Sequence, residues 1–293
     1  MPELVYLNGK LLPRGEARIS ISDHGFLYGY GLFQTMRAYH GKLFLLDRHL
    51  ERLYDAAEVI GMKQKLDGID LEKACNDTLK ANKLKEARVR VTVTNGEGLA
   101  MPWMDAGGPS NIVVTAVSYT PLTTEKYARG FNVGVASVRR LGQSAVSSMK
   151  SINYLLNVIA RMEAAEKGLD ETIILNDEGY IAEGGGSNIF FVRDSKLVTP
   201  SVNSGIIPGV TREVVIVLAA GMGVTVTEGT VGLGAIIKSD EAFMTNAIIE
   251  VMPVVSVRDE SGQVITIGGG KPGKVTRQLM EAYRDKVVGE TRS

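Results

Sequence analysis

Short runs of alternating apolar residues and longer runs at helical spacing divide the first 119 residues into predicted elements. The segments ELVYL and KLLP flank an Asn-Gly pair, which favours a tight hairpin turn, and LFQTMRAY and KLFLL flank His-Gly in the same way. The valines of ARVRVTVT alternate with polar residues, so this run predicts a strand exposed on one face, with NIVVTAVS as its neighbour. Two helices are predicted between these strands, one from about Asp47 to Gly61 and one over residues 69–82.

Beyond residue 119 the pattern changes. The stretch 120–129 contains a proline and few large apolar side chains, so it predicts a linker between an N-terminal α/β domain, residues 1–119, and a C-terminal domain, residues 130–293. In the second domain FNVGVASV predicts a strand, ETIIL and YIAEG a hairpin, and REVVIVLAAG an apolar helix. A further helix is predicted after Lys150, with one apolar face formed by Ile152, Leu155, Leu156, Ile159 and Met162. The expected fold is α+β in two domains.

Composition excludes several classes of function. Of the 293 residues 44% are hydrophobic and 23% are charged, as in an ordinary globular protein, and the net charge of 0 gives no reason to expect nucleic acid or a membrane surface as a partner. The single cysteine excludes an intrachain disulfide, and three scattered histidines do not predict a structural metal site. With no signal peptide pattern and no apolar run of membrane-spanning length, a cytoplasmic protein is expected.

One stretch, residues 147–192, contains residues that could perform catalysis. Lys150 precedes a helix and is flanked by apolar residues that could desolvate its amine, and Glu183 closes a strand just before three glycines. Pyridoxal phosphate requires of a protein an amine for covalent attachment, a carboxylate near the ring nitrogen, donors for the phosphate and a substrate pocket. A glycine turn allows the backbone to approach such a ligand. Taken singly, a lysine before a helix is usually solvated and a glutamate in a turn usually lies at the surface. The order of the three features is what favours a pyridoxal phosphate site with Lys150 as its attachment lysine.

Two further features could bind phosphate. The helix that begins near Pro208–Thr211 offers free amides to an anion, although Thr211 could equally be a plain N-cap, and Arg52 could supply a guanidinium or be an ordinary exposed charge. Gly268–Lys274 fits the nucleotide-binding pattern G-x-x-x-x-G-K, but Val275 stands where that loop needs serine or threonine. Too little chain follows to complete a parallel nucleotide-binding sheet, so a nucleotide site is disfavoured.

Several motifs in sequence order carry a resemblance to a known family. They are DHGFLYGYGLFQTMRAYHG, LDRHLERL, MKSINYL, AEGGGSNIFFV, GIIPGVTREVV, DEAFMTNAIIEVMPV and KPGKVTRQL. Nearly end to end, the chain resembles the class IV aminotransferases, the fold-type IV pyridoxal phosphate enzymes. The resemblance implies a two-domain fold with the cofactor between the domains, a homodimer or higher homo-oligomer, and an amino donor and a 2-oxo acid as substrates. It also makes Gly268–Lys274 an ordinary turn before the last helix.

The resemblance assigns roles to particular residues. Lys150 is the catalytic lysine that carries the cofactor, and Glu183 matches the carboxylate on the pyridine nitrogen. The remaining cofactor-binding positions are Arg52, Tyr154, Val210, Thr211 and Ala247. The substrate-binding positions are Tyr28, Phe33, Arg90, Ala247 and Ile248, with one of the two aromatic residues reaching across a dimer interface. Ala247 replaces a frequent threonine, which removes one hydroxyl from the expected phosphate site.

The substrate is less well determined than the cofactor. TNGEGLAMPWMDAGG lacks the Arg-x-His pair of D-amino-acid aminotransferases. Branched-chain enzymes usually have three residues between the lysine and Asn-Tyr, where this chain has two, and Phe-Glu-Gly, where it has Phe33-Gln34-Thr35. The pattern F-x-T-x-R favours aminodeoxychorismate lyases, whereas the ending GGGKPGKVTRQLMEAY favours aminotransferases. The prediction is a ping-pong aminotransferase for a branched-chain-like amino acid or an amine; a lyase giving 4-aminobenzoate and pyruvate, or a D-amino-acid or (R)-amine transaminase, are the alternatives.

Overall fold

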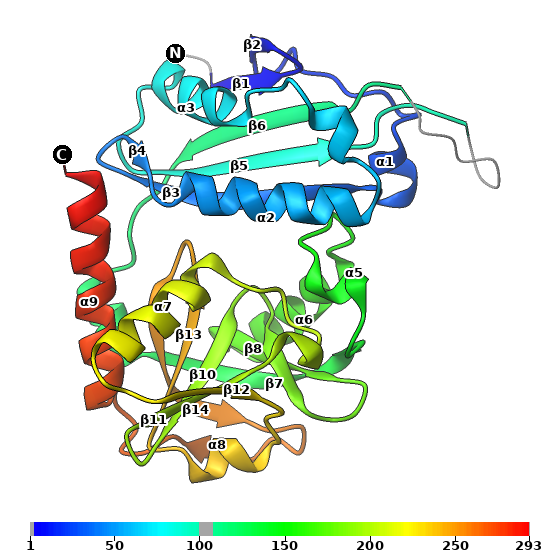
Figure 1. Cartoon of the computed structure of the whole chain (residues 1–293). Coiled ribbons are helices and arrows are strands. Elements are labelled where there is room, and N and C mark those ends of the chain that lie inside the picture. Colours follow the sequence, from blue (N-terminus) through cyan, green and yellow to red (C-terminus); the bar gives the residue numbers. More distant parts are fainter. Residues whose placement is uncertain (1–2, 100–107, 293) are drawn as a thin grey trace. The chain divides into compact units, whose positions relative to one another are not determined.

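A computed structural model describes residues 3–99 and 108–292, and the chain in it divides into two compact units (Figure 1). The first unit consists of Met1–Thr120, Met149–Asn153 and Val287–Ser293, and the second of Pro121–Ser148 and Tyr154–Lys286. Both units combine helices with a sheet, which confirms the expected α+β class. None of the helices in the described ranges has the length and hydrophobicity that a bilayer crossing requires.

The first unit is built on a six-stranded antiparallel sheet with strand order β2-β1-β6-β5-β3-β4. Its strands are β1 (Leu4–Leu7), β2 (Lys10–Pro13), β3 (Gly31–Tyr39), β4 (Lys42–Leu43), β5 (Ala87–Thr94) and β6 (Asn111–Ser118). Its helices are α1 (His24–Tyr28), α2 (Leu46–Val59), η1 (Lys63–Leu66) and α3 (Leu71–Ala81). Both predicted hairpins and both predicted helices are therefore confirmed.

The core of this unit lies between the sheet and the helices α2 and α3. Along β5, Val89, Val91 and Val93 are buried while the residues between them are more exposed, as the alternating sequence predicts. They pack in one cluster with Leu53 of α2 and Leu79 of α3. The apolar stripe of each helix is thus buried against one face of the sheet.

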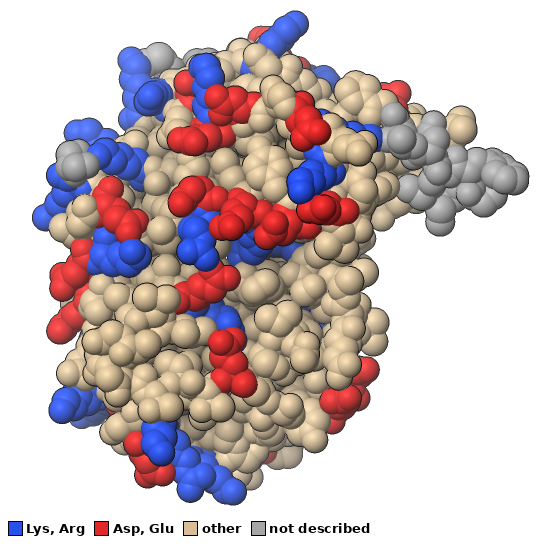
Figure 2. All heavy atoms as spheres, in the orientation of Figure 1, with Lys and Arg blue, Asp and Glu red and all other residues tan. Residues whose placement is uncertain are grey.

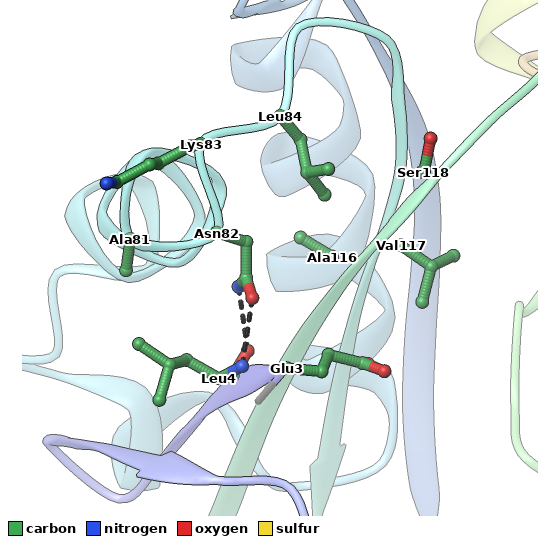
Figure 3. Close-up of a pocket in the computed structure, with 9 residues that line it drawn as sticks. All are labelled: Glu3, Leu4, Ala81, Asn82, Lys83, Leu84, Ala116, Val117 and Ser118. Atoms are coloured by element: carbon green, nitrogen blue, oxygen red, sulfur yellow. Dashed lines mark hydrogen bonds between the residues drawn. The ribbon is translucent and has the colours of Figure 1, made fainter. Parts of the chain in front are cut away.

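A cavity of about 500 Å³ lies where β1 separates from β6 (Figure 3). The pairing of Tyr6 with Val114, if continued, would place Leu4 opposite Ala116, but the side chain of Asn82 bonds both backbone groups of Leu4 instead, at 2.9 and 2.8 Å. An amide side chain can replace a strand partner in this way because it carries the same donor and acceptor as a peptide. The cavity contains none of the predicted site residues.

The second unit contains a nine-stranded mixed sheet with the order β12-β11-β10-β13-β14-β7-β8-β9, and β15 pairs with β14. The strands are β7 (Phe131–Arg140), β8 (Glu171–Asn176), β9 (Ile181–Gly184), β10 (Asn188–Arg193), β11 (Lys196–Pro200), β12 (Val226–Gly229), β13 (Glu241–Asn246), β14 (Glu250–Arg258) and β15 (Val264–Thr266). The helices are α4 (Thr124–Arg129), α5 (Ala145–Ser148), α6 (Leu155–Glu166), η2 (Val202–Ser204), α7 (Val210–Gly221), α8 (Gly234–Lys238) and α9 (Lys274–Thr291), whose last residues belong to the first unit.

The chain is divided differently from the predicted domains in two places. Most of the predicted linker 120–129 is the helix α4, which is capped by Thr123 and buries Tyr127 in the core of the second unit. The segment that carries Lys150, predicted for the C-terminal domain, belongs to the first unit because its backbone extends the sheet there: Phe33 N donates to Lys150 O at 2.9 Å. The Thr123 cap of α4 is a local signal that the linker prediction overlooked, whereas the pairing of the Lys150 segment with a distant strand has no local signature.

The helix α6 buries a different face from the one predicted. Its buried positions are Asn157, Ala160 and Ala164. The predicted apolar face is largely exposed, with Leu155 70% and Met162 56% accessible. The prediction was wrong because it assigned the large apolar side chains to the core, whereas small ones allow the helix to approach β7 and β8 closely.

On the face drawn in Figure 2, charged side chains gather over the upper part and along the left side, and the lower centre is largely uncharged. Where they gather, basic and acidic groups are mixed, and among the described residues on that face no extended surface of one sign appears. This agrees with a net charge of 0.

Candidate functional site

In the first unit, the amine of Lys150 lies against an aromatic ring. The segment 149–153 is fixed by backbone hydrogen bonds from Phe33 N to Lys150 O (2.9 Å) and from Ile152 N to Gly31 O (3.0 Å). The Nζ atom of Lys150 is 4.8 Å from the ring centroid of Phe33, and the guanidinium of Arg90 is 3.8 Å from the same centroid. One ring therefore positions two cations through cation–π contacts, and three of the predicted site residues are brought together.

Arg52 belongs to the same group of residues. Its guanidinium donates to Oε1 of the buried Gln34 at 2.5 Å, and Gln34 follows Phe33 directly in β3. Arg52, the fourth predicted site residue of this unit, is thus hydrogen-bonded to β3, the strand that contacts Lys150. We call Phe33, Gln34, Arg52, Arg90 and Lys150, together with His49, the Lys150 cluster.

His49 was not predicted as a site residue. It lies one turn before Arg52 on α2 and is only 4% exposed. Burial, together with the positive charges of Arg52 and Lys150, holds the pKa of His49 well below its ordinary value, so the imidazole is neutral. The signal in the sequence was its spacing of three residues from Arg52 in HLERL, which puts both side chains on one side of a helix.

Tyr28 lies elsewhere in the first unit. It ends α1, is partly exposed, and contacts the ring of the buried His24 edge-on at a centroid distance of 5.3 Å. The following residue, Gly29, accepts a hydrogen bond from Asn153 Nδ2 at 3.0 Å. Tyr28 is therefore tied to the Lys150 segment through the backbone.

In the second unit, Glu183 is buried and its carboxylate is held from several sides. Arg140 donates to Oε1 at 2.6 Å, and both side chains of this ion pair are almost inaccessible. The backbone N–H of Ile207 and Nδ2 of Asn188 donate to Oε2 at 2.9 and 3.4 Å. Three donors, one of them charged, stabilise the ionised form of this buried carboxylate. Sequence reasoning missed Arg140 and Asn188, although Asn188 was visible in the AEGGGSN motif.

Tyr154 contacts the glycine turn that follows Glu183. Its hydroxyl donates to the carbonyl of Gly185 at 3.4 Å. Burial, with smaller effects from the negative charges of Glu183 and Glu171, raises the pKa of Tyr154 to about 12. The phenol is therefore protonated at neutral pH and can act as a hydrogen-bond donor.

The start of α7 lies beside the same carboxylate. The N-cap of α7 is Gly209, which has no side chain to accept a hydrogen bond from the first amides of the helix. Thr211 is buried inside the first turn, so plain capping is not its role. Asn188 donates to Ile207 O at 2.9 Å, which joins this helix start to Glu183. Val210 and Thr211 thus begin a helix whose positive end could bind an anion.

The turn that contains Ala247 and Ile248 is fixed against the glycines. Asn246 Nδ2 donates to Gly186 O at 2.8 Å, and its Oδ1 accepts from the amides of Ile248 and Ile249, both at 2.8 Å. The neighbouring hydroxyls of Ser187 and Thr245 are buried and have no hydrogen-bond partner within residues 3–99 and 108–292. These orphaned hydroxyls fit a site that binds a polar ligand. We call Glu183, Arg140, Asn188, Tyr154, the start of α7 and this turn the Glu183 cluster.

Gly268–Lys274 does not form a phosphate-binding loop. The carboxylate of Glu241 accepts hydrogen bonds from the amides of Val275 and Thr276, at 3.0 and 2.7 Å, and so occupies the start of α9. A carboxylate at that position repels phosphate. This turn before the last helix is what the family resemblance implied.

Comparison with known proteins gives a consistent result. The family model described as Amino-transferase class IV matches residues 31–257. A putative branched-chain-amino-acid aminotransferase of Methanocaldococcus jannaschii is 38% identical over 96% of this chain and 95% of its own length. The aminodeoxychorismate lyase of Bacillus subtilis is 31% identical, with 97% and 94% covered. A solved structure, the T.th. branched-chain amino acid aminotransferase with pyridoxamine 5′-phosphate, matches with a TM-score of 0.86 and 29% identity, covering 100% of this chain and 97% of that one.

The chain belongs to the class IV aminotransferases. Its activity is that of a transaminase, which moves an amino group between an amino acid and a 2-oxo acid, and the members of this family are pyridoxal phosphate enzymes. The family and the activity that the motifs predicted are confirmed.

Proposed function

We propose that this transaminase binds pyridoxal phosphate through Lys150 and uses a branched-chain or similar aliphatic amino acid as donor and a 2-oxo acid as acceptor. The observation that carries the cofactor proposal is the buried Glu183 carboxylate with its three donors, one of them Arg140. A carboxylate kept ionised in this way is the partner that a protonated pyridine nitrogen requires.

The described residues fit the rest of the cofactor. At the start of α7, Val210 and Thr211 would hold the phosphate, and Tyr154 would donate its hydroxyl hydrogen to the phenolic oxygen of the cofactor. The family resemblance also assigns Arg52 to the phosphate. The turn at Ala247 would add backbone groups. When bound, pyridoxal phosphate supplies an electron-withdrawing ring that stabilises negative charge at the substrate Cα.

Protein side chains perform the proton transfer and the orientation of the substrate. Lys150, once its amine is free, would move a proton from the substrate Cα to C4′ of the cofactor in one half-reaction and in the opposite direction in the other. Its contact with the Phe33 ring limits the positions of Nζ, so little reorganisation is needed. Arg90 supplies a cation for a substrate carboxylate, and the Phe33 ring an apolar wall for an aliphatic side chain.

The choice of donor is supported by the relative from Methanocaldococcus jannaschii, whose description names branched-chain amino acids. The test is a panel of leucine, D-alanine and an (R)-amine, each with 2-oxoglutarate or pyruvate. Borohydride treatment followed by peptide mapping should find the cofactor on Lys150. Colourless protein that takes up no added pyridoxal phosphate would exclude the cofactor proposal, and deamination of D-alanine but not leucine would exclude the donor.

A lyase is the second candidate. Phe33-Gln34-Thr35-Met36-Arg37 follows the F-x-T-x-R pattern of aminodeoxychorismate lyases, and the relative from Bacillus subtilis is described as one. In the structure Gln34 bonds Arg52 with a neutral amide, whereas the branched-chain pattern has a glutamate there. Release of 4-aminobenzoate and pyruvate from aminodeoxychorismate, with none of the panel donors deaminated, would favour the lyase.

A homodimer is also proposed, and the exposed face of α6 supports it. Leu155, Val158, Ile159 and Met162 form an apolar stripe on a surface helix, and such stripes usually pack against another surface. A second copy of the chain is the partner that the family resemblance implies. Met162→Lys should shift the sedimentation profile of the protein toward the monomer, whereas Met222→Lys on the end of α7 should leave it unchanged.

A further inference from the structure

The turn that contains Ala247 and Ile248 is followed by a strained residue. Glu250, the first residue of β14, has a φ of +57°, a left-handed conformation that glycine adopts readily and glutamate rarely does. Among the non-glycine residues with positive φ in the ranges 3–99 and 108–292, Glu250 is the only buried one. Such strain persists only where the surrounding contacts enforce it, and it is often found at functional sites.

Two other side chains join Glu250 back to the turn. The carboxylate of Glu250 accepts a hydrogen bond from Nε of Arg284 on α9 at 3.4 Å, and the guanidinium of Arg284 lies 4.7 Å from the ring centroid of Tyr127. Tyr127 belongs to α4 and donates its hydroxyl hydrogen to the carbonyl of Ile249 at 3.2 Å. Since Ile249 and Glu250 are adjacent, the contacts close a ring. We call Glu250, Arg284 and Tyr127 the turn clamp.

The turn is therefore held at its amides and at a carbonyl. The side chain of Asn246 accepts from the amides of Ile248 and Ile249 and attaches the turn to Gly186, while Tyr127 of the turn clamp binds the carbonyl of Ile249. All of these residues belong to the second unit. A short turn held in this way does not have to become ordered when a ligand binds to it, so less binding energy is lost.

Stability alone does not account for a glutamate at position 250. A glycine there would adopt the left-handed conformation without strain. The ion pair with Arg284 contributes little to stability, because 45% of the Arg284 side chain is exposed to solvent. What Glu250 adds is the link through Arg284 to Tyr127, and hence the fixed shape of the turn.

We propose that Glu250, Arg284 and Tyr127 are positioning residues, which hold the turn Ala247–Ile249 in the conformation that the transaminase reaction requires. The proposal rests on the proposed function in one respect, the assignment of Ala247 and Ile248 to the binding of substrate. Each residue of the turn clamp acts through the backbone of the turn rather than by contact with a ligand. The strain at Glu250 is a consequence of keeping the carboxylate within reach of Arg284.

The first test is amide hydrogen exchange of the cofactor-free protein, followed by NMR. Glu250→Gly removes both the strain and the carboxylate, and Tyr127→Phe removes only the hydroxyl. Both variants should speed the exchange of the Ile248 and Ile249 amides by about tenfold, while amides in the middle of β13 and β14 stay within about twofold. The matched control is Ser195→Gly, because Ser195 is exposed and has a φ of +58°, so glycine relieves strain there without touching the turn.

The second test is the transaminase reaction at saturating pyridoxal phosphate. Glu250→Gly should raise the KM for the amino donor about tenfold and Tyr127→Phe about threefold to tenfold, the effect of one hydrogen bond, with kcat within about threefold of the wild type. Urea denaturation should find Glu250→Gly close to the wild type in stability, because the relief of strain offsets the greater freedom of the unfolded chain. A higher KM in that variant is then not a failure to fold.

Two results would overturn the proposal. One is unchanged exchange of the turn amides in both Glu250→Gly and Tyr127→Phe. The other is faster exchange with an unchanged KM, or with a KM that Ser195→Gly raises equally. If the wild-type protein takes up no pyridoxal phosphate and converts no donor, the proposed function fails separately, and exchange in the cofactor-free protein still decides whether the turn clamp holds the turn.

Discussion

The Lys150 cluster and the Glu183 cluster are organised in opposite ways. Around Glu183 the polar groups bond one another: the carboxylate has Arg140, Ile207 and Asn188 as donors, and Asn188 continues the network to the start of α7. Around Lys150 two cations lie against one aromatic ring, and Arg52 donates a hydrogen bond to the neutral amide of Gln34.

The difference separates two tasks. A carboxylate that must stay ionised beside a bound ring has to be fixed before the ligand arrives, because an unpaired buried charge is costly. The Lys150 amine, in contrast, would have to detach from the cofactor and move a proton, and its contact with the Phe33 ring is one that lets Nζ change position.

The largest expected effect comes from removing the amine. Lys150→Ala should abolish borohydride-stable attachment of the cofactor and lower the rate of amino transfer by at least about 10²–10⁴-fold, since attachment and proton transfer both depend on Nζ. Mass spectrometry of the reduced protein and steady-state kinetics measure the two effects. The matched control is Lys274→Ala at the exposed start of α9, which should keep full activity; a loss there would revive the nucleotide-loop interpretation.

Next in size is the loss of the fixed carboxylate. Glu183→Gln leaves the buried Arg140 without its counter-ion, so the free energy of unfolding should fall by about 3 kcal/mol. The rate should fall by about 10²-fold or more, because a preorganised charge at the cofactor is lost. Urea denaturation and single-turnover kinetics measure these effects.

Glu171→Gln is the control for burial alone. Glu171 is as buried as Glu183, and burial raises the pKa of its carboxyl, but its partner Arg161 is mostly exposed. Its neutralisation should change stability by no more than about 1 kcal/mol. If Glu183→Gln and Glu171→Gln lose activity equally, the proposal that the Glu183 carboxylate has a specific role at the cofactor is wrong.

A smaller effect tests how rigid the Glu183 network is. A Cβ at Gly209 would lie 2.1 Å from Oδ1 of Asn188, so Gly209→Ala must displace the side chain that links the start of α7 to Glu183. We expect a loss of about 1–3 kcal/mol in stability and weaker binding of the cofactor. Gly221→Ala at the other end of α7 meets no described atom within 4 Å and should be neutral or slightly stabilising. Unchanged cofactor binding in Gly209→Ala would mean that the network is adaptable.

Local pattern was sufficient for most elements of the fold. Short stretches of sequence determine these elements, so they were predictable. They are the hairpins at Asn8–Gly9 and His40–Gly41, the helices α2 and α3, and the alternation along β5. The helix α6 was assigned the wrong buried face because a stripe of large apolar residues normally faces the core, and here that side is covered by no described residue of the chain.

Site residues could be predicted only where a family motif contains them. Lys150, Glu183 and Thr211 stand in such motifs, and their roles stay predictions. Arg140 was missed for a physical reason, because its importance depends on a partner 43 residues away. His49 stands in the motif LDRHLERL, but its burial beside Arg52 is visible only in the structure. The grouping of Lys150 with the first unit has the same origin, since pairing between Leu32 and Ser151 has no local signature. Residues 100–107, part of the stretch TNGEGLAMPWMDAGG that lacks the Arg-x-His pair, lie outside the described residues.

The smallest effect concerns Tyr154 and alkaline pH. Its folded-state pKa, about 12, lies above the ordinary value of 10, so the folded protein retains a phenolic proton that the unfolded chain releases between these values. The contribution of this proton to stability is complete below pH 10 and is lost as the pH rises toward 12. Tyr154→Phe has no such proton, so its unfolding free energy should fall less than that of the wild type between about pH 9 and pH 11.5, as measured by urea denaturation. Tyr180→Phe, an exposed tyrosine of the same unit, should fall in parallel with the wild type. If Tyr154→Phe does so too, burial beside Glu183 does not perturb the phenol, and the Glu183 cluster is more open to water than its hydrogen bonds indicate.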